Sequence, residues 1–294
     1  MDNTKMHRPP FALATLIPLA ALAQTPHRTE RDIPYAEPKN ERQLLDVYAP
    51  PTGSKLPVVV WVHGGGWQQG SKNEMNHKPE AFVEKGYVFV AMNYRLFPNV
   101  PMDTIVRDVA KSVGWVHANI ARYGGDPDRL FLMGHSAGAQ LAALLSTDTR
   151  YIEAEGVPIT AIKGCVPVDG DTYDVPLEIA TSTARRKNLN QPAPKWGHPE
   201  KFGNLERQRA LSAVNHVALN RGIPPFLLLH VADHTDTTAQ AYRLWAALDQ
   251  AGIPARLYGA DSTDHVKLDR DLGLPDDPAT RELFAFTGRI LQRQ

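Results

Sequence analysis

Short runs of aliphatic and β-branched residues alternate along this chain with segments of helical periodicity. The expected strands lie at residues 44–48, 57–62, 87–92, 129–133, 162–168, 225–231 and 255–258. The helical patterns between and after them lie at residues 79–85, 104–122, 137–145, 238–251 and 279–291. Several of the strand runs are apolar throughout, which is typical of strands buried on both faces of a sheet. The sequence therefore predicts one α/β domain, with a mostly parallel, twisted sheet of about eight strands and helices on both faces.

The N-terminal residues have the layout of a secretory signal peptide. Lys5 and Arg8 precede an apolar stretch at 11–23, which ends in small residues before a cleavage site near Ala23. That stretch is too short to cross a bilayer, which needs about twenty residues, so we expect no stable membrane insertion. We predict that residues 1–23 are removed and that the protein is secreted or periplasmic.

Two other segments differ in composition from the predicted domain. Residues 24–40 are polar and contain prolines, and we expect them to form a flexible approach to a domain spanning 41–294. Residues 171–224 interrupt the strand and helix alternation and are rich in charge and proline. We expect this insertion to form a small cap over the sheet.

The overall composition excludes several classes of partner. Lys and Arg together equal Asp and Glu together, at 32 each, so no net field attracts nucleic acid or an anionic membrane. The single cysteine, Cys165, excludes an internal disulfide and a cysteine-built zinc site, and it lies in an apolar run that indicates a buried strand. A small neutral molecule is the simpler partner. Export without disulfides favours a bacterial source.

Residues 134–138 read Gly-His-Ser-Ala-Gly and lie between a predicted strand and a predicted helix. This context is that of a nucleophile elbow, in which a tight turn exposes a serine at the carboxyl end of the sheet. Glycines at 134 and 138 lack the Cβ that would crowd such a turn. The sequence therefore predicts that Ser136 is a nucleophile.

Residues 63–67 read His-Gly-Gly-Gly-Trp and follow directly on the strand that ends at Val62. Consecutive glycines expose backbone N–H groups, which can stabilise the oxyanion of a tetrahedral intermediate by about 3 kcal/mol each. We expect Gly64, Gly65 and Gly66, with the amide of Ala137, to form an oxyanion hole. The loop lacks the lysine and spacing of a phosphate-binding loop.

A serine hydroxyl needs a base, and two histidines follow the strand at 225–231, where the chain order of this fold places one. His234 shares a loop with the candidate acids and would struggle to face both them and the serine. His265 stands on a separate loop after the last expected strand. We therefore predict that His265 is the base.

The acid that orients the base has two main candidates on one loop, Asp233 and Asp236. Asp233 is nearer the end of the preceding strand, whereas Asp236 is placed to cap the following helix. We favour Asp233 and keep Asp236 as the alternative. Asp171 is a third candidate, and Asp261 and Asp264 flank the base as loop residues.

These motifs, in this order, resemble those of α/β-hydrolase carboxylesterases over about residues 40–293. Trp67 and His135 are similar to residues of the branch that contains bacterial feruloyl and carboxyl esterases and kynurenine formamidase. In that branch the acid stands seven residues before a glutamine, as Asp233 does before Gln240. The segment His230-Val231-Ala232-Asp233 departs from the pattern of the branch. Relatives often have a glycine directly after the histidine and one more residue before the acid.

The resemblance implies a fold, an activity and a set of roles. Ser136 would be the nucleophile, Asp233 the acid and His265 the base, with Gly64 to Gly66 and Ala137 as oxyanion donors. It implies neither a metal nor an organic cofactor. The expected activity is hydrolysis of small to medium carboxylic esters through an acyl-enzyme on the serine.

Other functions remain open at this point. An arylformamidase would use the same residues on an aryl formamide, and a transferase or peptidase would also share them. A hydrolase fold that has become a catalytically silent binding protein is a further alternative. Residues expected to contact substrate or influence its choice are Trp67, His135, Trp196, Arg185 and Arg186.

Overall fold

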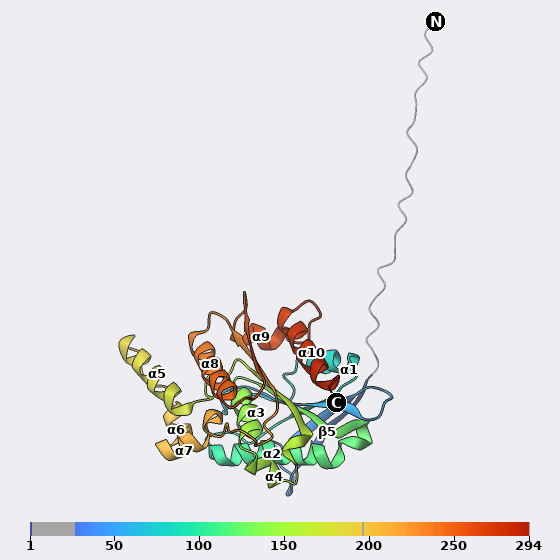
Figure 1. The fold of residues 1–294 in the computed structure, drawn as a ribbon, viewed down its shortest axis with the longest axis horizontal. Coiled ribbons are helices and arrows are strands. Elements are labelled where there is room, and N and C mark those ends of the chain that lie inside the picture. Colours follow the sequence, from blue (N-terminus) through green and yellow to red (C-terminus); the bar gives the residue numbers. More distant parts are fainter. Residues whose placement is uncertain (2–26, 196, 294) are drawn as a thin grey trace.

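A computed structural model describes residue 1 and residues 27–195 and 197–293. Within these residues eight strands form one sheet in the order β1-β2-β4-β3-β5-β6-β7-β8. Figure 1 shows the fold as a ribbon, with the helices around the sheet. Their bounds are β1 Arg28–Pro34, β2 Leu44–Ala49, β3 Leu56–Val62, β4 Val88–Met92, β5 Gly125–His135, β6 Ile162–Val168, β7 Phe226–Val231 and β8 Ala255–Ala260. Only the β1–β2 and β2–β4 pairs are antiparallel. The predicted mostly parallel sheet, the sheet of an α/β-hydrolase fold, is confirmed.

Helices cover both faces of the sheet. Their bounds are α1 Lys78–Glu84, α2 Met102–Asn119, α3 Ala137–Thr147, α4 Arg150–Glu153, α5 Val175–Asn188, α6 His198–Phe202, α7 Leu205–Ala210, α8 Thr235–Gln250, α9 His265–Asp271 and α10 Pro278–Leu291. Short 3-10 helices lie at Ile120–Tyr123, Ile159–Ala161 and Ala213–Asn215. Buried side chains of α2, α3 and α8 share one core cluster, and those of α1, α9 and α10 share the other. The predicted helices appear, with their ends shifted by a few residues, whereas α4, α5, α6, α7 and α9 were not predicted.

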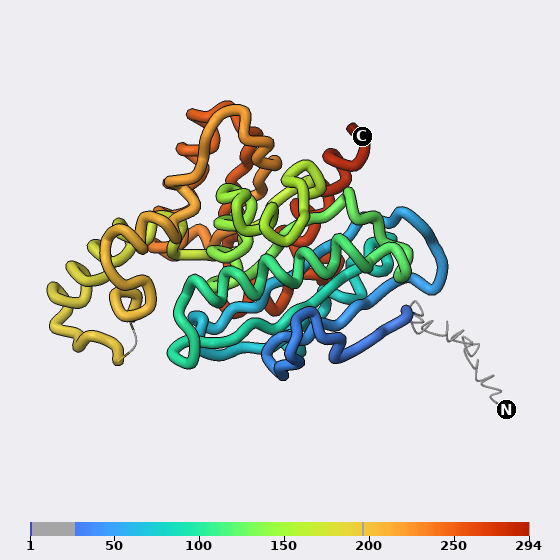
Figure 2. Tube along the Cα trace, turned by 90° about the horizontal axis from the view of Figure 1, so that it is seen from below, coloured from blue at the N-terminus to red at the C-terminus, as the bar shows by residue number. Residues whose placement is uncertain are grey.

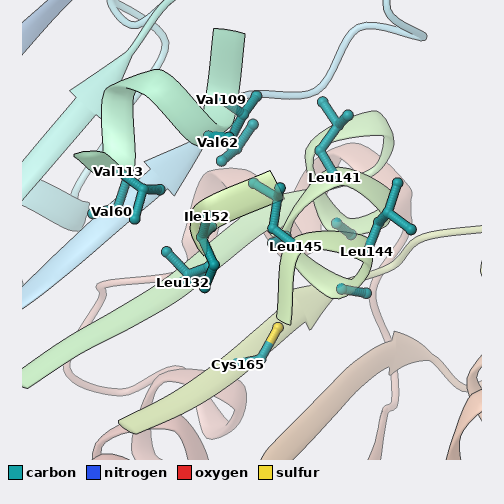
Figure 3. Close-up of a cluster of buried hydrophobic side chains, with 14 of the residues drawn as sticks. Val60, Val62, Val109, Val113, Leu132, Leu141, Leu144, Leu145, Ile152 and Cys165 are labelled. Carbon is teal, nitrogen blue, oxygen red and sulfur yellow. The ribbon is translucent and has the colours of Figure 1, made fainter. Parts of the chain in front are cut away.

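The core shows why the central strands are apolar throughout. Along β3, Val60 and Val62 point to the face covered by α2 and α3, while Val59 and Trp61 point to the opposite face. Figure 3 shows the first cluster, in which side chains from β3, α2 and α3 meet. Cys165 of β6 is fully buried in the same cluster, as predicted. A strand whose side chains enter a hydrophobic core on each face of the sheet has no position for a polar side chain.

The N-terminal approach differs from the expectation. Residues 28–34 are not a flexible segment but form β1, an edge strand antiparallel to β2. Most of its side chains are exposed, so polarity alone concealed a strand that pairs through its backbone. The predicted signal peptide lies outside the described residues, apart from residue 1. Among the described residues, no helix is long and apolar enough to cross a membrane.

The insertion at 171–224 contains α5, α6, α7 and the last 3-10 helix. Figure 2 shows this yellow to orange part of the tube projecting from one side of the sheet. Helix α5 begins with Asp174, whose side chain accepts a hydrogen bond from the Leu177 amide, and with a proline in its first turn. Trp196 lies outside the described residues. The described residues of 171–224 thus form a helical unit beside the carboxyl end of β6.

Candidate active site

Ser136 stands at the bend between β5 and α3 with φ 55° and ψ −118°, a conformation that a non-glycine residue adopts only under strain. Its amide donates to the Val168 carbonyl over 2.9 Å. A Cβ on Gly134 would lie 2.5 Å from the Gly138 oxygen, and one on Gly138 would lie 2.1 Å from the Val62 oxygen. Both glycines are therefore required for α3 to pass this close to β3, and the predicted elbow is present.

His265 is the first residue of α9, not a loop residue, and its ring lines the same cavity as Ser136. The helix start is fixed by Asp264, whose carboxylate accepts hydrogen bonds from the Val266 and Lys267 amides. The structure thus brings together the serine and the histidine that the sequence selected. A helix cap holds the imidazole more firmly than a loop would.

The carboxylate that contacts His265 is Asp169, the residue directly after β6. Its Oδ2 lies 2.6 Å from His265 Nδ1, and its Oδ1 accepts the Val231 amide over 2.9 Å. The Asp169 side chain is 1% exposed. Because the Nδ1–H donates to this carboxylate, Nε2 of a neutral His265 carries the lone pair that accepts a proton.

The two groups also shift each other's pKa. Burial alone would raise the pKa of Asp169, but hydrogen bonds from His265, Thr237 and the Val231 amide outweigh it and hold that pKa below its usual value. Burial alone would lower the pKa of His265, but the hydrogen bond and charge of Asp169 outweigh it and raise that pKa. The pair is therefore arranged to stabilise a protonated imidazole beside the serine.

The expectation that Asp233 orients the base is corrected by this geometry. Asp233 is exposed, and Asp236 is paired instead with Arg185 of α5. The amide of Val231, the last residue of β7, is turned onto Asp169, so the acid position beside His265 is filled from the neighbouring strand. A signal was available in the sequence: Asp169 directly follows the apolar run at 162–168.

His234 and Asp171, the other groups weighed for these roles, stand apart from the Asp169–His265 contact. The His234 Nδ1 lies 2.8 Å from the Thr237 hydroxyl, and its ring centroid lies 6.0 Å from that of His265. Asp171 lines a second cavity, described below. The exclusion of His234 as the base agrees with this placement.

His135, expected to contact substrate, supports the base as well as lining the cavity. Its ring centroid lies 4.4 Å from that of His265, and its Nε2–H donates to the His265 carbonyl over 2.9 Å. Burial lowers the pKa of His135 to about 4, which keeps it neutral. The buried Lys78 ammonium holds the same helix, because it donates to the Asp269 carbonyl and forms an ion pair with the Asp269 carboxylate. Residue 135 thus helps to fix the position of α9 relative to the elbow.

The glycine loop forms another part of the cavity wall. Gly64, Gly65 and Gly66 line it together with Ser136. A Cβ on Gly65, where φ is 105°, would lie 2.2 Å from the Gln69 oxygen, so the loop closes only with glycine there. Other lining residues of this cavity, of about 560 Å³, are Trp61, His63, Gln68, Gln69, Glu74, His135, His265, Val266 and Asp269.

Trp67 does not line this cavity, contrary to the expectation that it contacts substrate. It is 2% exposed, and its indole Nε1–H donates to Gln140 Oε1 over 3.2 Å. Its ring packs edge-on against Phe202, with centroids 5.1 Å apart. The tryptophan therefore anchors the glycine loop to α3 and α6. An isolated aromatic in a sequence does not reveal whether a later helix will cover it.

A second cavity, of about 620 Å³, lies between α5, α6 and the first turn of α8. Gln68 lines both cavities, so the two are neighbours. Arg185 and Arg186, predicted to influence substrate choice, line the second cavity. Its remaining lining residues are Asp171, Glu178, Ser182, Thr183, Lys187, Gln191, Ala193, Pro194, Gly197, His198, Pro199, Glu200, Lys201 and Asp236.

Glu178 in this second cavity gives a prediction about stability. Its side chain is 3% exposed, and burial, with the charges of Asp171 and Asp236, raises its pKa to about 8. The unfolded chain loses this proton near pH 4.5, so the native state loses stability as the pH rises from there through about 8. Glu178→Gln keeps the neutral form and is expected to gain stability over the wild type at pH 9 but not at pH 4.

Urea unfolding midpoints at the two pH values measure this difference. The exposed Glu84 on α1 provides the control, because Glu84→Gln is expected to change the midpoint by the same small amount at both pH values. A Glu178→Gln midpoint that follows the wild type from pH 4 to pH 9 would show that this carboxyl titrates as it does in the unfolded chain.

The fold and the site together define an α/β-hydrolase esterase: a serine at a strained strand-to-helix bend, an imidazole backed by a buried carboxylate, and a glycine loop lining the same cavity. The chain belongs to the BD-FAE family, whose model matches residues 45–248. It is 31% identical to kynurenine formamidase of Danio rerio, covering 91% of this chain and 85% of that protein. It is 30% identical to esterase LipQ of Mycobacterium tuberculosis, covering 92% of this chain but only 65% of that protein.

Among solved structures, esterase B from Lactobacillus rhamnosis superposes with a TM-score of 0.73, at 21% identity. The match covers 91% of this chain and 88% of that one. At this identity the likeness concerns the fold. It shows that the sheet and helices described above are those of an α/β hydrolase.

Proposed function

We propose that this protein cleaves small to medium carboxylic esters through an acyl-enzyme on Ser136. The observation that carries the proposal is the contact of 2.6 Å between Asp169 and His265, made by a histidine that shares a cavity with Ser136 and the glycine loop. A base, the group that orients it, a nucleophile and backbone donors are the parts that acyl transfer from a serine requires.

These positions support the following reaction. His265 Nε2 takes the proton of Ser136 as its Oγ attacks the ester carbonyl, and Asp169 stabilises the imidazolium that results. Amides of the glycine loop and of Ala137 hold the oxyanion of the tetrahedral intermediate. The imidazolium then protonates the departing alcohol oxygen, leaving the acyl group on the serine. A water molecule then attacks the acyl-enzyme with His265 again acting as the base, and the carboxylic acid and the free enzyme are released.

A second candidate activity uses the same residues on an aryl formamide. It is favoured by the similarity over most of both chains to a protein named kynurenine formamidase. The apolar segment at 11–23 supports the ester instead, because we also propose that it directs export to the periplasm or medium, away from intracellular tryptophan breakdown. We therefore place the ester first.

Covalent labelling combined with substrate profiling tests the proposal. A fluorophosphonate probe is expected to modify the peptide containing Ser136, with the mass of one organophosphoryl group, and a catalytically silent binding protein would remain unlabelled. The kcat/KM values for 4-nitrophenyl acetate and butyrate, an ethyl ferulate and N-formylkynurenine should then favour an ester. Absence of both labelling and turnover would refute the hydrolase assignment, and a large preference for the formamide would select the second candidate.

A further inference from the structure

Lys201 of α6 is a buried cation with an unusual environment. Its side chain is 7% exposed, and its Nζ lies 5.2 Å from the ring centroid of Trp67. Its backbone amide donates to the Gly197 carbonyl, but among the residues that the structure describes its ammonium has neither a hydrogen bond nor an ion pair. A desolvated ammonium is costly unless an anion meets it, so the position points to a ligand that supplies one.

The position of Lys201 connects it with the proposed chemistry. A Cβ on Gly66 of the glycine loop would lie 3.9 Å from the Nζ, which places the ammonium beside the predicted oxyanion donors. The lysine lines the second cavity, whose neighbour across Gln68 holds Ser136. A substrate acylating the serine can therefore extend one of its groups to Lys201.

The other charges of the second cavity favour an anion. Arg185 and Asp236 form an ion pair and cancel. Glu178 is uncharged at neutral pH because burial raises its pKa to about 8, and burial also lowers the pKa of His198. Three cations, Arg186, Lys187 and Lys201, then face two carboxylates, Asp171 and Glu200. Asp171 acts on Lys201 through space without forming an ion pair with it.

We propose that the second cavity is a substrate subsite in which Lys201 binds a carboxylate, so that the preferred substrates are esters carrying an anionic group. The inference rests on the proposed ester hydrolysis and names its substrate class. It assigns to Lys201 a role in specificity. The ammonium and the carboxylate form a charge-assisted hydrogen bond in a site shielded from water.

Matched ester pairs test this subsite. The first pair is mono-4-nitrophenyl glutarate and 4-nitrophenyl butyrate, in which the acyl group does or does not carry the carboxylate. The second pair is 4-acetoxybenzoate and its methyl ester, in which the leaving group differs in the same way. For at least one of the two pairs, we expect the wild-type kcat/KM for the anionic ester to exceed that for the neutral ester, so that the ratio of the two values is above one. In Lys201→Met the same ratio is expected to fall about tenfold to a hundredfold, mostly through KM.

Lys111→Met provides the control, because it removes the same charge from an exposed position on α2, outside the lining of the second cavity. Its ratio should change by less than about twofold, since solvent screens that charge. Lys201→Arg, which keeps the charge, should retain more of the ratio than Lys201→Met. Equal ratios in the wild type and Lys201→Met for both pairs would overturn the subsite. A wild type inactive on every ester would instead refute the proposed function.

Discussion

A Ser136→Ala variant is expected to lose about a millionfold in kcat on 4-nitrophenyl butyrate, the scale of loss when a serine hydrolase loses its nucleophile. Removal of the Oγ leaves no atom on which the acyl group can form, while the backbone donors of Gly64 to Gly66 remain. The residual rate over water would come from those donors and from substrate binding. The loss should therefore appear in kcat, with KM changed much less.

Initial rates over a range of substrate concentrations measure this effect, and thermal unfolding of both proteins provides its control. Alanine keeps the Cβ of Ser136, so the bend with φ 55° is under the same backbone strain and the unfolding midpoint should stay close to that of the wild type. A folded variant that retains more than about a tenth of the wild-type kcat would show that another residue is the nucleophile.

Much of the fold was predictable because its signals are local. The run at 57–62 is rich in β-branched residues and contains no polar residue. Such a continuous apolar run is typical of a strand buried on both faces. The elbow was predictable for the same reason, since the glycines that it needs lie within two residues of Ser136. Strand β1 was missed because an exposed edge strand at 28–34 gains its stability from backbone pairing with β2, which leaves no apolar pattern.

Local signals place Asp169 and Asp233 each after an expected strand, but they do not select which of the two is the partner of the base. Asp169 and His265 are 96 positions apart, and adjacent strands each deliver carboxylates to the same edge of the sheet. The sequence favoured Asp233 because it lies close to the end of the strand at 225–231 and seven residues before Gln240, and Asp169 was not considered. Tertiary structure is what separates Asp169 from Asp233, because the Val231 amide donates to Asp169. The backbone of Asp169 has φ 49°, a left-handed conformation that aspartate tolerates better than most residues.

The position of Trp67 was hidden from the sequence in a similar way. It follows three glycines beside the predicted nucleophile, so proximity suggested contact with substrate. Helix α6, which covers it, lies more than a hundred positions later in an insertion without periodic apolar residues. Burial of this ring and the placement of Lys201 over it arise together when α6 docks on the glycine loop.

The two candidate acids predict opposite outcomes for a matched pair of substitutions. Asp169→Asn is expected to lower kcat by about 10⁴-fold, because an amide facing His265 Nδ1 favours the wrong tautomer and cannot stabilise the imidazolium. Its Oδ1 can still accept the Val231 amide, so the fold should be retained. Asp233→Asn, at an exposed position, should change kcat by less than about threefold, the range expected of an exposed charge.

Steady-state kinetics with 4-nitrophenyl butyrate, with circular dichroism of all three proteins, decides between the two acids. The Asp169→Asn loss should lie in kcat with little change in KM, because that carboxylate contacts the base and not the substrate. Since the charge of Asp169 raises the pKa of His265, the acid limb of the kcat/KM profile should also move to lower pH in that variant. A folded Asp233→Asn protein that is inactive beside an active Asp169→Asn protein would show that the working enzyme pairs His265 with the acid after β7.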